Sequence, residues 1–366
     1  MQLPVDIKAV IDEALDIDEA RHTALSASVY LDDTAPSDLQ AHVRQAFASA
    51  SPHARVSLTY LDGRPFAPFE GDDMAVIVAG LNERVGFFAE QLRAAGVPVM
   101  VVTTLPSIVS DIAAQQGHPI PSGDVVAPKA PLSPALPAAD GRADEASAEP
   151  SEPYRLDAEA ASSLDERMGG WVVDACREKR LAFALAFPFV RKPLSLEAVN
   201  STALQNAGVG LLVIIPGADM PVMTLNQAKM LLMVAAAYGE ELGMDRVKEL
   251  AALVGGAFAC RAVARQLVAF VPGLGWAVKA AIGYTGTVAM GRAAIQYYED
   301  GATMSTLTEA VARARDKVVR AAASRAASKA RTTGAKAAAN VRERASRAAS
   351  SARSAASSRF APGKAR

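Results

Sequence analysis

The chain has 366 residues, which at about 100–200 residues per domain corresponds to two domains with additional segments. Four histidines, two cysteines and 5% aromatic residues exclude a disulfide-rich scaffold and a Cys/His metal cluster, and we expect no metal ion or cofactor. The charges are unevenly distributed, because residues 311–366 have 15 basic and two acidic side chains (net +13), whereas residues 1–310 have a net charge of −14. An acidic body with a strongly basic tail indicates an anionic surface as the partner rather than a small substrate.

Residues 1–22 are predicted to form an acidic helical lead. Six acidic residues occur at amphipathic helical spacing: Asp6, Asp12, Glu13, Asp16, Asp18 and Glu19. The segment lacks a basic stretch followed by an apolar stretch, so we expect no secretory signal. Cys176 and Cys260 are then expected to be buried thiols in a reducing compartment.

Residues 23–115 are predicted to form a small α/β domain. The pattern of apolar residues predicts strands at 24–31, 55–61, 74–79 and 97–104, and helices at 36–49 and 82–95. The third and fourth strands are continuous apolar runs, which is typical of strands buried on both faces. Strand, helix and strand within about 30 residues indicate a βαβ unit and a partly parallel sheet. Asp72 and Asp73 precede the third strand, where they either hold Mg²⁺ or form a turn.

Residues 116–155 are predicted to be a disordered linker. Eight prolines occur in this segment among Ala, Ser, Gly and acidic residues, with almost no large apolar side chain after Val126. Such a composition buries too little apolar surface to offset the entropy of ordering.

Residues 156–300 are predicted to be helical throughout. We expect helices at 157–180, 194–215, 225–238, 244–270 and 274–298, with Thr224 as the N-cap of the third. Small residues at four-residue spacing, such as Gly283, Thr287 and Gly291, allow close backbone approach in lipid or in a tight helical bundle. Two charge-poor stretches, 198–218 and 266–291, are borderline in length and apolarity for crossing a bilayer. The predicted fold class is therefore α+β and multidomain, with membrane-prone helices.

Several strings in the helical part form a recognisable pattern. They are Pro216-Gly-Ala-Asp219, Thr224-Leu-Asn-Gln227, Gly255-Gly256, Val271-Pro-Gly-Leu-Gly-Trp276 and Gly291-Arg-Ala-Ala. Over about residues 165–300 the chain resembles the YcjF-like, GTPase-associated family of unknown function. The resemblance implies a bacterial, helical, membrane-associated module that is often fused behind a P-loop GTPase domain, and it supplies no catalytic residues. It implies these motif residues: Pro216, Gly217, Asp219, Thr224, Asn226, Gln227, Gly255, Gly256, Pro272, Gly273, Gly275, Trp276, Gly291 and Arg292.

This chain itself lacks the sequence of a P-loop. The string Gly-x4-Gly-Lys-Ser/Thr, whose amide groups and lysine hold nucleotide phosphates, does not occur. The strand at 97–104 leads into Thr103-Thr104-Leu105-Pro106 and not into an Asn/Thr-Lys-x-Asp guanine-reading motif. The N-terminal domain is thus either a degenerate GTPase-like domain or an unrelated small α/β domain, and we expect no enzymatic activity.

Charged residues near the apolar helices and in the tail are candidate contacts to lipid or another polyanion. They are Arg261, Arg265, Lys279, Arg313, Arg320, Arg325 and Lys329, to which the motif residue Arg292 adds a further charge. In a soluble bundle the helical ones are its solvated face, whereas at a bilayer their side chains reach phosphate head groups. Asp219 either caps the helix that follows or belongs to an ion or partner site.

The tail, residues 301–366, is an Ala/Arg/Ser-rich low-complexity segment without heptads. We expect it to be disordered or a solvated helix until it meets a polyanion, and it lacks the interleaved aromatic residues of single-strand binders. The sequence favours a non-enzymatic protein whose helical hairpins anchor in or lie on the inner membrane, with both termini cytoplasmic, self-association and a P-loop GTPase partner. The alternative is a soluble cytoplasmic helical oligomer whose tail binds nucleic acid.

Overall fold

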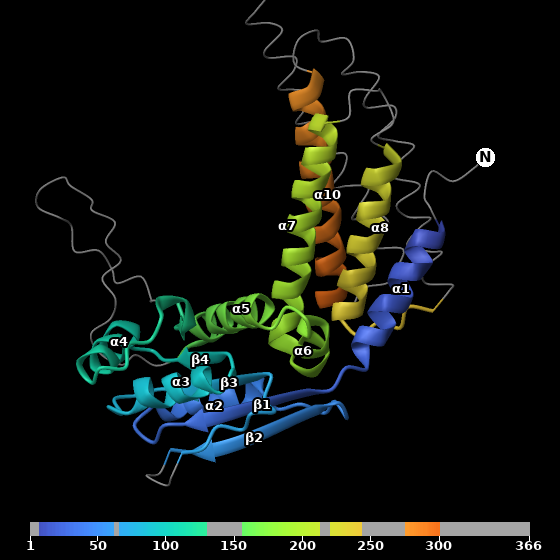
Figure 1. The fold of residues 1–366 in the computed structure, drawn as a ribbon. Coiled ribbons are helices and arrows are strands. Elements are labelled where there is room, and N and C mark those ends of the chain that lie inside the picture. Colours follow the sequence, from blue (N-terminus) through green and yellow to red (C-terminus); the bar gives the residue numbers. More distant parts are fainter. Residues whose placement is uncertain (1–6, 62–65, 130–155, 213–219, 244–274, 301–366) are drawn as a thin grey trace, which may run out of the picture. The chain divides into compact units, whose positions relative to one another are not determined.

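The computed structural model describes residues 7–61, 66–129, 156–212, 220–243 and 275–300 (Figure 1). They form an N-terminal α/β sheet followed by a mostly helical region, which confirms the coarse fold class predicted from the sequence.

The sheet has five strands, all parallel, in the order β2-β1-β3-β4-β5. The strands are β1 (Leu25–Leu31), β2 (Ala54–Tyr60), β3 (Met74–Val78), β4 (Val99–Val102) and β5 (Val125–Val126). All residues of β3 and β4 are buried, as expected for continuous apolar runs at the centre of a parallel sheet. The strand β2 lies at one edge, and most of its side chains are exposed.

Helices cover both faces of the sheet. On one face, α3 (Val85–Ala94) and α4 (Pro106–Gln115) bury apolar side chains against Tyr30, Ile77 and Val101. On the other face, α2 (Ser37–Ala46) buries Leu39 and Val43 in a core that includes alternate residues of β1 and β3. The alternation of side chains along each strand therefore supplies two separate apolar layers.

The linker prediction is wrong for residues 116–129. After α4, a short 3₁₀ helix (Ser122–Asp124) leads into β5, which pairs with β4. Ile120 and Val126 are buried, because the pair Val125-Val126 completes the sheet. A strand of two residues gives too short an apolar signal to stand out among prolines. The remainder of the predicted linker, 130–155, lies outside the described residues.

The helical region comprises α5 (Ala158–Ala175), α6 (Arg180–Ala186), α7 (Pro188–Leu212), α8 (Met220–Ala237) and α10 (Gly275–Glu299). The helices α7, α8 and α10 pack side by side, with the most extensive contact between α7 and α10 (Figure 1). Three boundaries predicted from the sequence are wrong, and one of them is the start of α7, which lies at Pro188 and not at residue 194. The helix expected at 157–180 ends at Ala175, and α8 begins at Met220, so Thr224 lies inside it and is no N-cap. Pro221 in the first turn of α8 fits this earlier start.

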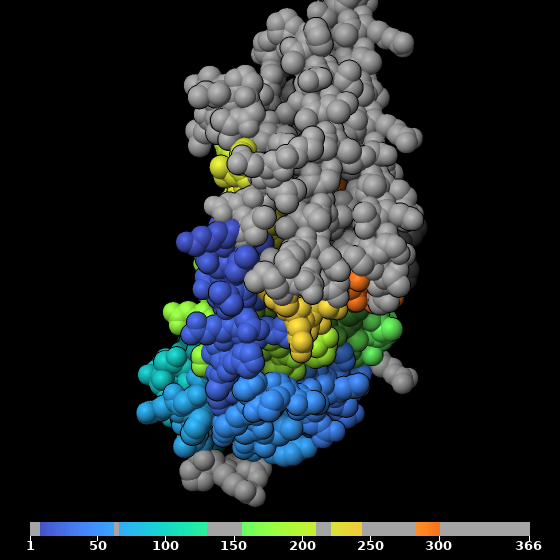
Figure 2. All heavy atoms as spheres, turned by 90° about the vertical axis from the view of Figure 1, so that its right-hand side faces the viewer, coloured from blue at the N-terminus to red at the C-terminus, as the bar shows by residue number. Residues whose placement is uncertain are grey.

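The acidic lead is helix α1 (Ile7–Arg21), and it packs against α8 (Figure 2). Lys229 Nζ of α8 lies 2.6 Å from Glu13 Oε2 of α1. The guanidinium of Arg21 donates to the carbonyl oxygens of Gly239, at 3.2 Å, and of Glu240. These carbonyls follow α8, so a cation there complements the negative end of its dipole.

A single apolar core joins the α2 face of the sheet to the helical region. It includes Leu39 of α2, Met168 of α5, Phe187 beside α6, and Leu232 of α8, all almost fully buried. No described helix combines the length and the apolarity needed to cross a membrane. The segments 213–219 and 244–274, which contain parts of both charge-poor stretches, lie outside the described residues.

Candidate functional site

Two of the motif residues, Asn226 and Gln227, take part in a polar layer between α7, α8 and α10. Asn206 Nδ2 of α7 donates to Thr287 Oγ1 of α10 at 3.0 Å, and Gln227 Nε2 of α8 donates to the same oxygen at 2.8 Å. Asn226 Nδ2 donates to Asn206 Oδ1 at 3.0 Å. Asn206, Gln227 and Thr287 are all fully buried. The motif residues Asn226 and Gln227 therefore act together with two residues that the motif analysis did not single out.

Glycines bring the three helices close enough for this layer to form. A Cβ atom on Gly283 would lie 2.4 Å from Met223 Cε and 3.0 Å from the carbonyl oxygen of Asn206. A Cβ atom on Gly291 would lie 2.2 Å from Val199 Cγ2 of α7. Thr287 sits midway between these glycines, and its Oγ1 donates to the carbonyl oxygen of Gly283 at 2.7 Å. The predicted small-residue stripe is thus a site of close helix packing.

The polar groups of this layer are suited to holding the three helices in alignment. Its side chains are amides and a hydroxyl, none of which ionises near neutral pH, and the bonds they make join all three helices. A buried hydrogen-bonded layer in an apolar helix interface penalises any shift in register, because a shift would leave polar groups unpaired. Met223, Thr224 and Ala203 surround it as buried neighbours on the same helices.

The carboxyl edge of the sheet is a second candidate site, because ligands of open α/β sheets bind where the strand order reverses. In the order β2-β1-β3-β4-β5, this point lies between β1 and β3. The carboxylate of Asp32, directly after β1, is fully buried there. It accepts hydrogen bonds from the backbone amides of Thr34 (3.0 Å) and Gly80 (2.8 Å) and from Thr34 Oγ1 (2.7 Å).

Backbone packing closes the crevice at the same point. A Cβ atom on Gly80 would lie 2.3 Å from the carbonyl carbon of Thr34 and 2.4 Å from the nitrogen of Ala35. The loop after β1 therefore lies directly on the loop after β3. Backbone amides of this kind bind phosphate groups in nucleotide sites, but here a carboxylate of the chain itself takes two of them and adds negative charge.

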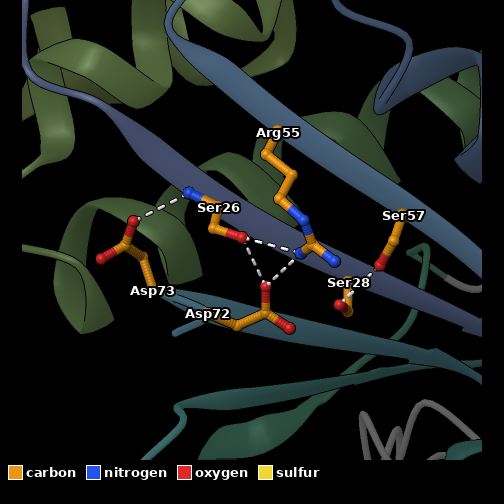
Figure 3. A network of polar contacts seen from close by, with 6 residues as sticks. All are labelled: Ser26, Ser28, Arg55, Ser57, Asp72 and Asp73. Carbon is orange, nitrogen blue, oxygen red and sulfur yellow. Dashed lines mark hydrogen bonds and ion pairs between the residues drawn. The ribbon is translucent and has the colours of Figure 1, made fainter. Parts of the chain in front are cut away.

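Asp72 and Asp73 lie at the opposite, amino edge of the sheet, in the network drawn in Figure 3. Asp72 Oδ1 accepts from Ser26 Oγ (2.6 Å) and from Arg55 Nη1 (3.1 Å), and Asp73 Oδ2 accepts from the amide of Ser26 (2.9 Å). Lys179 Nζ lies 2.7 Å from Asp73 Oδ1. Each carboxylate thus has its own cationic side chain, which favours the structural interpretation over Mg²⁺. The described residues contain no cluster of three or more metal-ligating side chains.

Cys176 lies next to this network. Its Sγ donates to the carbonyl oxygen of Asp73 at 3.8 Å, within the limit for sulfur. Burial raises the pKa of the Cys176 thiol to about 12, with the charge of Asp73 as a smaller cause. The expectation of a buried thiol is confirmed for Cys176, whereas Cys260 lies outside the described residues.

Few of the other candidate residues fall within the described parts of the chain. Arg292 is exposed on α10. The backbone of α10 includes Gly275, Trp276 and Lys279. The remaining candidates lie outside the described residues: Pro216, Gly217, Asp219, Gly255, Gly256, Arg261, Arg265, Pro272, Gly273, Arg313, Arg320, Arg325 and Lys329.

Comparison with models of known protein families, with curated proteins and with solved structures gave no match.

Proposed function

We propose that this protein is a non-enzymatic bacterial binding protein that attaches to an anionic membrane surface through its basic tail. The observation that carries the proposal is the division of charge, with a net charge of +13 in residues 311–366 and −14 in residues 1–310. Each basic residue near an anionic leaflet contributes about 1 kcal/mol to binding, so a third of the 15 tail charges would hold the chain there. The acidic body is repelled by the same surface and would face the cytoplasm.

The carboxyl edge of the sheet supports a non-enzymatic role for the α/β part, because the backbone amides that could hold a phosphate there are bonded to Asp32. The carboxylate of Asp32 accepts hydrogen bonds from the backbone amides of Thr34 and Gly80, at the point where this fold class binds its ligands. Since the chain also lacks a P-loop string, we propose that nucleotide hydrolysis is supplied by a separate P-loop GTPase. The resemblance to the YcjF-like, GTPase-associated family supports this choice of partner.

The helical region would add a second contact with lipid. The described parts of the two charge-poor stretches face one another, because Val199 of α7 packs on Gly291 of α10 and Asn206 binds Thr287. We therefore place the main attachment in the tail, with the helical hairpins lying on the inner leaflet as an auxiliary apolar contact.

Vesicle flotation with the full-length chain tests the proposal. The chain should float with anionic vesicles at low salt, and binding should fall at high salt and with neutral lipid, because the attraction is electrostatic. Replacing Arg313, Arg320, Arg325 and Lys329 by Gln should weaken binding by roughly tenfold or more.

A matched variant carries the same charge change on exposed positions of the body: Lys8, Arg44, Arg84 and Arg177 to Gln. It should lose much less binding than the tail variant, because the body is not the part that contacts the anionic surface. Equal losses in the two variants would refute a tail-based attachment. Flotation of the tail variant with neutral lipid at high salt would make the apolar helices the main anchor. Tail-dependent binding of duplex DNA without binding of vesicles would favour nucleic acid as the partner.

A further inference from the structure

Among the described residues, the outer edge of β2 has no neighbouring strand. β2 is the terminal strand of the sheet, and no described element lies beyond it (Figure 1). Its side chains Leu58 and Tyr60 are 50% and 52% exposed, although both are large and apolar. Edge strands of stable monomers are usually protected by proline, by several charges or by a bulge. The seven residues Ala54–Tyr60 contain no proline and a single charge, that of Arg55.

The hydrogen bonds between β1 and β2 show which backbone groups of β2 point away from β1. The amide of Leu61 donates to Leu31, and the carbonyl oxygen of His53 accepts from Leu25, so the odd-numbered residues of β2 face β1. In a parallel pair the alternate residues point their amide and carbonyl groups away. Val56 and Leu58 therefore direct their backbone donors and acceptors toward the open edge.

β2 can pair with a second copy of itself in the antiparallel direction. If a second copy of β2 runs antiparallel with Ser57 opposite Ser57, Val56 lies opposite Leu58 and Ala54 opposite Tyr60. These even-numbered residues carry the free backbone groups, so they form the hydrogen-bonded pairs of an antiparallel ladder. On the other face Arg55 lies opposite Thr59, so no two like charges face each other across the paired strands. All seven residues of the strand are paired in this register.

We propose that two copies of this protein associate through antiparallel pairing of β2, with Ser57 on the two-fold axis, so that their sheets become continuous. Two-fold symmetry of this kind uses the same patch on both partners, which is what a self-complementary strand offers. The exposed Leu58 and Tyr60 of each copy then lie in an apolar contact across the junction, on the face that also carries Arg44 of α2, whose guanidinium reaches Tyr60.

Cysteine cross-linking tests the register directly in the full-length chain. In a non-hydrogen-bonded antiparallel pair the two Cα atoms lie about 4.5 Å apart, within the range of a disulfide. Ser57→Cys should therefore give a disulfide-linked dimer under mild oxidation. Thr59→Cys is the matched control, because the two introduced cysteines would lie roughly 13 Å apart along the paired strands. The chain without an introduced cysteine should remain unlinked.

Sedimentation velocity of the native chain should show a concentration-dependent monomer–dimer equilibrium. Leu58→Pro removes an amide that faces the open edge and leaves the bonds to β1 intact, so the variant should be monomeric with an unchanged circular dichroism spectrum. Leu58→Lys should give the same loss if the proline variant does not fold, whereas Leu204→Lys, at a still more exposed leucine of α7, should dimerise as the native chain does. A native chain that stays monomeric, or equal cross-linking of Ser57→Cys and Thr59→Cys, would overturn the proposal.

Discussion

Single residues set the closest contacts in this molecule, and Gly80 is the clearest case. The loop after β1 passes so close to Gly80 that any side chain there meets backbone atoms of Thr34 and Ala35, which have no freedom to move aside. The same contact positions the amide of Gly80 for its bond to Asp32. One small residue thus allows the loops that follow β1 and β3 to contact each other directly.

Gly80→Ala should destabilise the chain by about 1–3 kcal/mol, because it overpacks a backbone contact. Urea unfolding followed by circular dichroism measures the change. Gly123→Ala is the control, since a Cβ atom there meets nothing within 4 Å. Equal stability of the two variants would show that the loops after β1 and β3 are not in close contact.

Cys176 should resist alkylation in the folded chain. The thiolate is the reactive form, and burial raises the thiol pKa from 9.0 to about 12, so little thiolate is present at pH 8. In a Cys260→Ser variant, iodoacetamide should label the chain slowly under native conditions and completely in denaturant. Rapid native labelling would show that this thiol is accessible and ionised.

The same shift predicts a dependence of stability on pH. Between pH 9 and about 12 the unfolded chain loses the thiol proton while the folded chain keeps it. The contribution of the protonated Cys176 thiol to the free energy of unfolding is therefore fully present below pH 9 and is lost as the pH rises toward 12. Cys176→Ala should reduce the fall in the free energy of unfolding over this range, and an unchanged slope would contradict the assignment.

At the scale of elements, the interface between α7 and α10 depends on small residues and one polar layer. Gly283 and Gly291 let α10 approach α7, and Asn206, Gln227 and Thr287 fix the register of the helices that meet there. The two features act together, because the hydrogen bonds require the short separation that the glycines allow.

Two glycines of α10 should respond to alanine with opposite signs. Gly291→Ala should destabilise by about 1–3 kcal/mol, because its Cβ meets the branched side chain of Val199. Gly286→Ala should stabilise by up to about 1 kcal/mol, because that position is open and alanine favours the helix. Thermal unfolding of both variants gives the comparison, and a loss of stability in Gly286→Ala would contradict it.

Asn206→Leu should destabilise the chain by about 1–3 kcal/mol although it adds apolar surface. The change leaves the Asn226 side chain without its acceptor at 3.0 Å and Thr287 without one of its donors. Gln205→Leu, at the exposed neighbouring position, is the control and should change stability little. A stable Asn206→Leu chain would mean that the layer does not hold the helices in register.

The sequence predicted those elements whose signal is local. β1 to β4 were found because alternating or continuous apolar runs of four or more residues have few other interpretations. β5 was missed because it has two residues, and the start of α8 because Thr224 fits a cap as well as a helix interior. The bond between Asn206 and Thr287 joins residues 81 positions apart, so no local pattern could reveal it. The glycine spacing alone pointed to that interface.

At the scale of the whole molecule, charge is divided along the chain. The acidic sequence before residue 311 includes all the described structure, in which one apolar core runs from the α2 face of the sheet into α8. The basic segment, residues 311–366, follows this core in the sequence. It contains few large apolar side chains. In the function that we propose, the body presents binding surfaces and the tail supplies attachment.

Membrane fractionation of cells that contain the full-length protein tests the central claim, attachment to an anionic membrane, most directly. Membranes are collected at low salt, treated with nuclease to remove nucleic acid, and then washed at high salt. We expect the protein to remain with the membranes through nuclease treatment and to be largely released by the salt wash, as for attachment dominated by the tail. Protein found in the supernatant at low salt, or released by nuclease alone, would contradict the account.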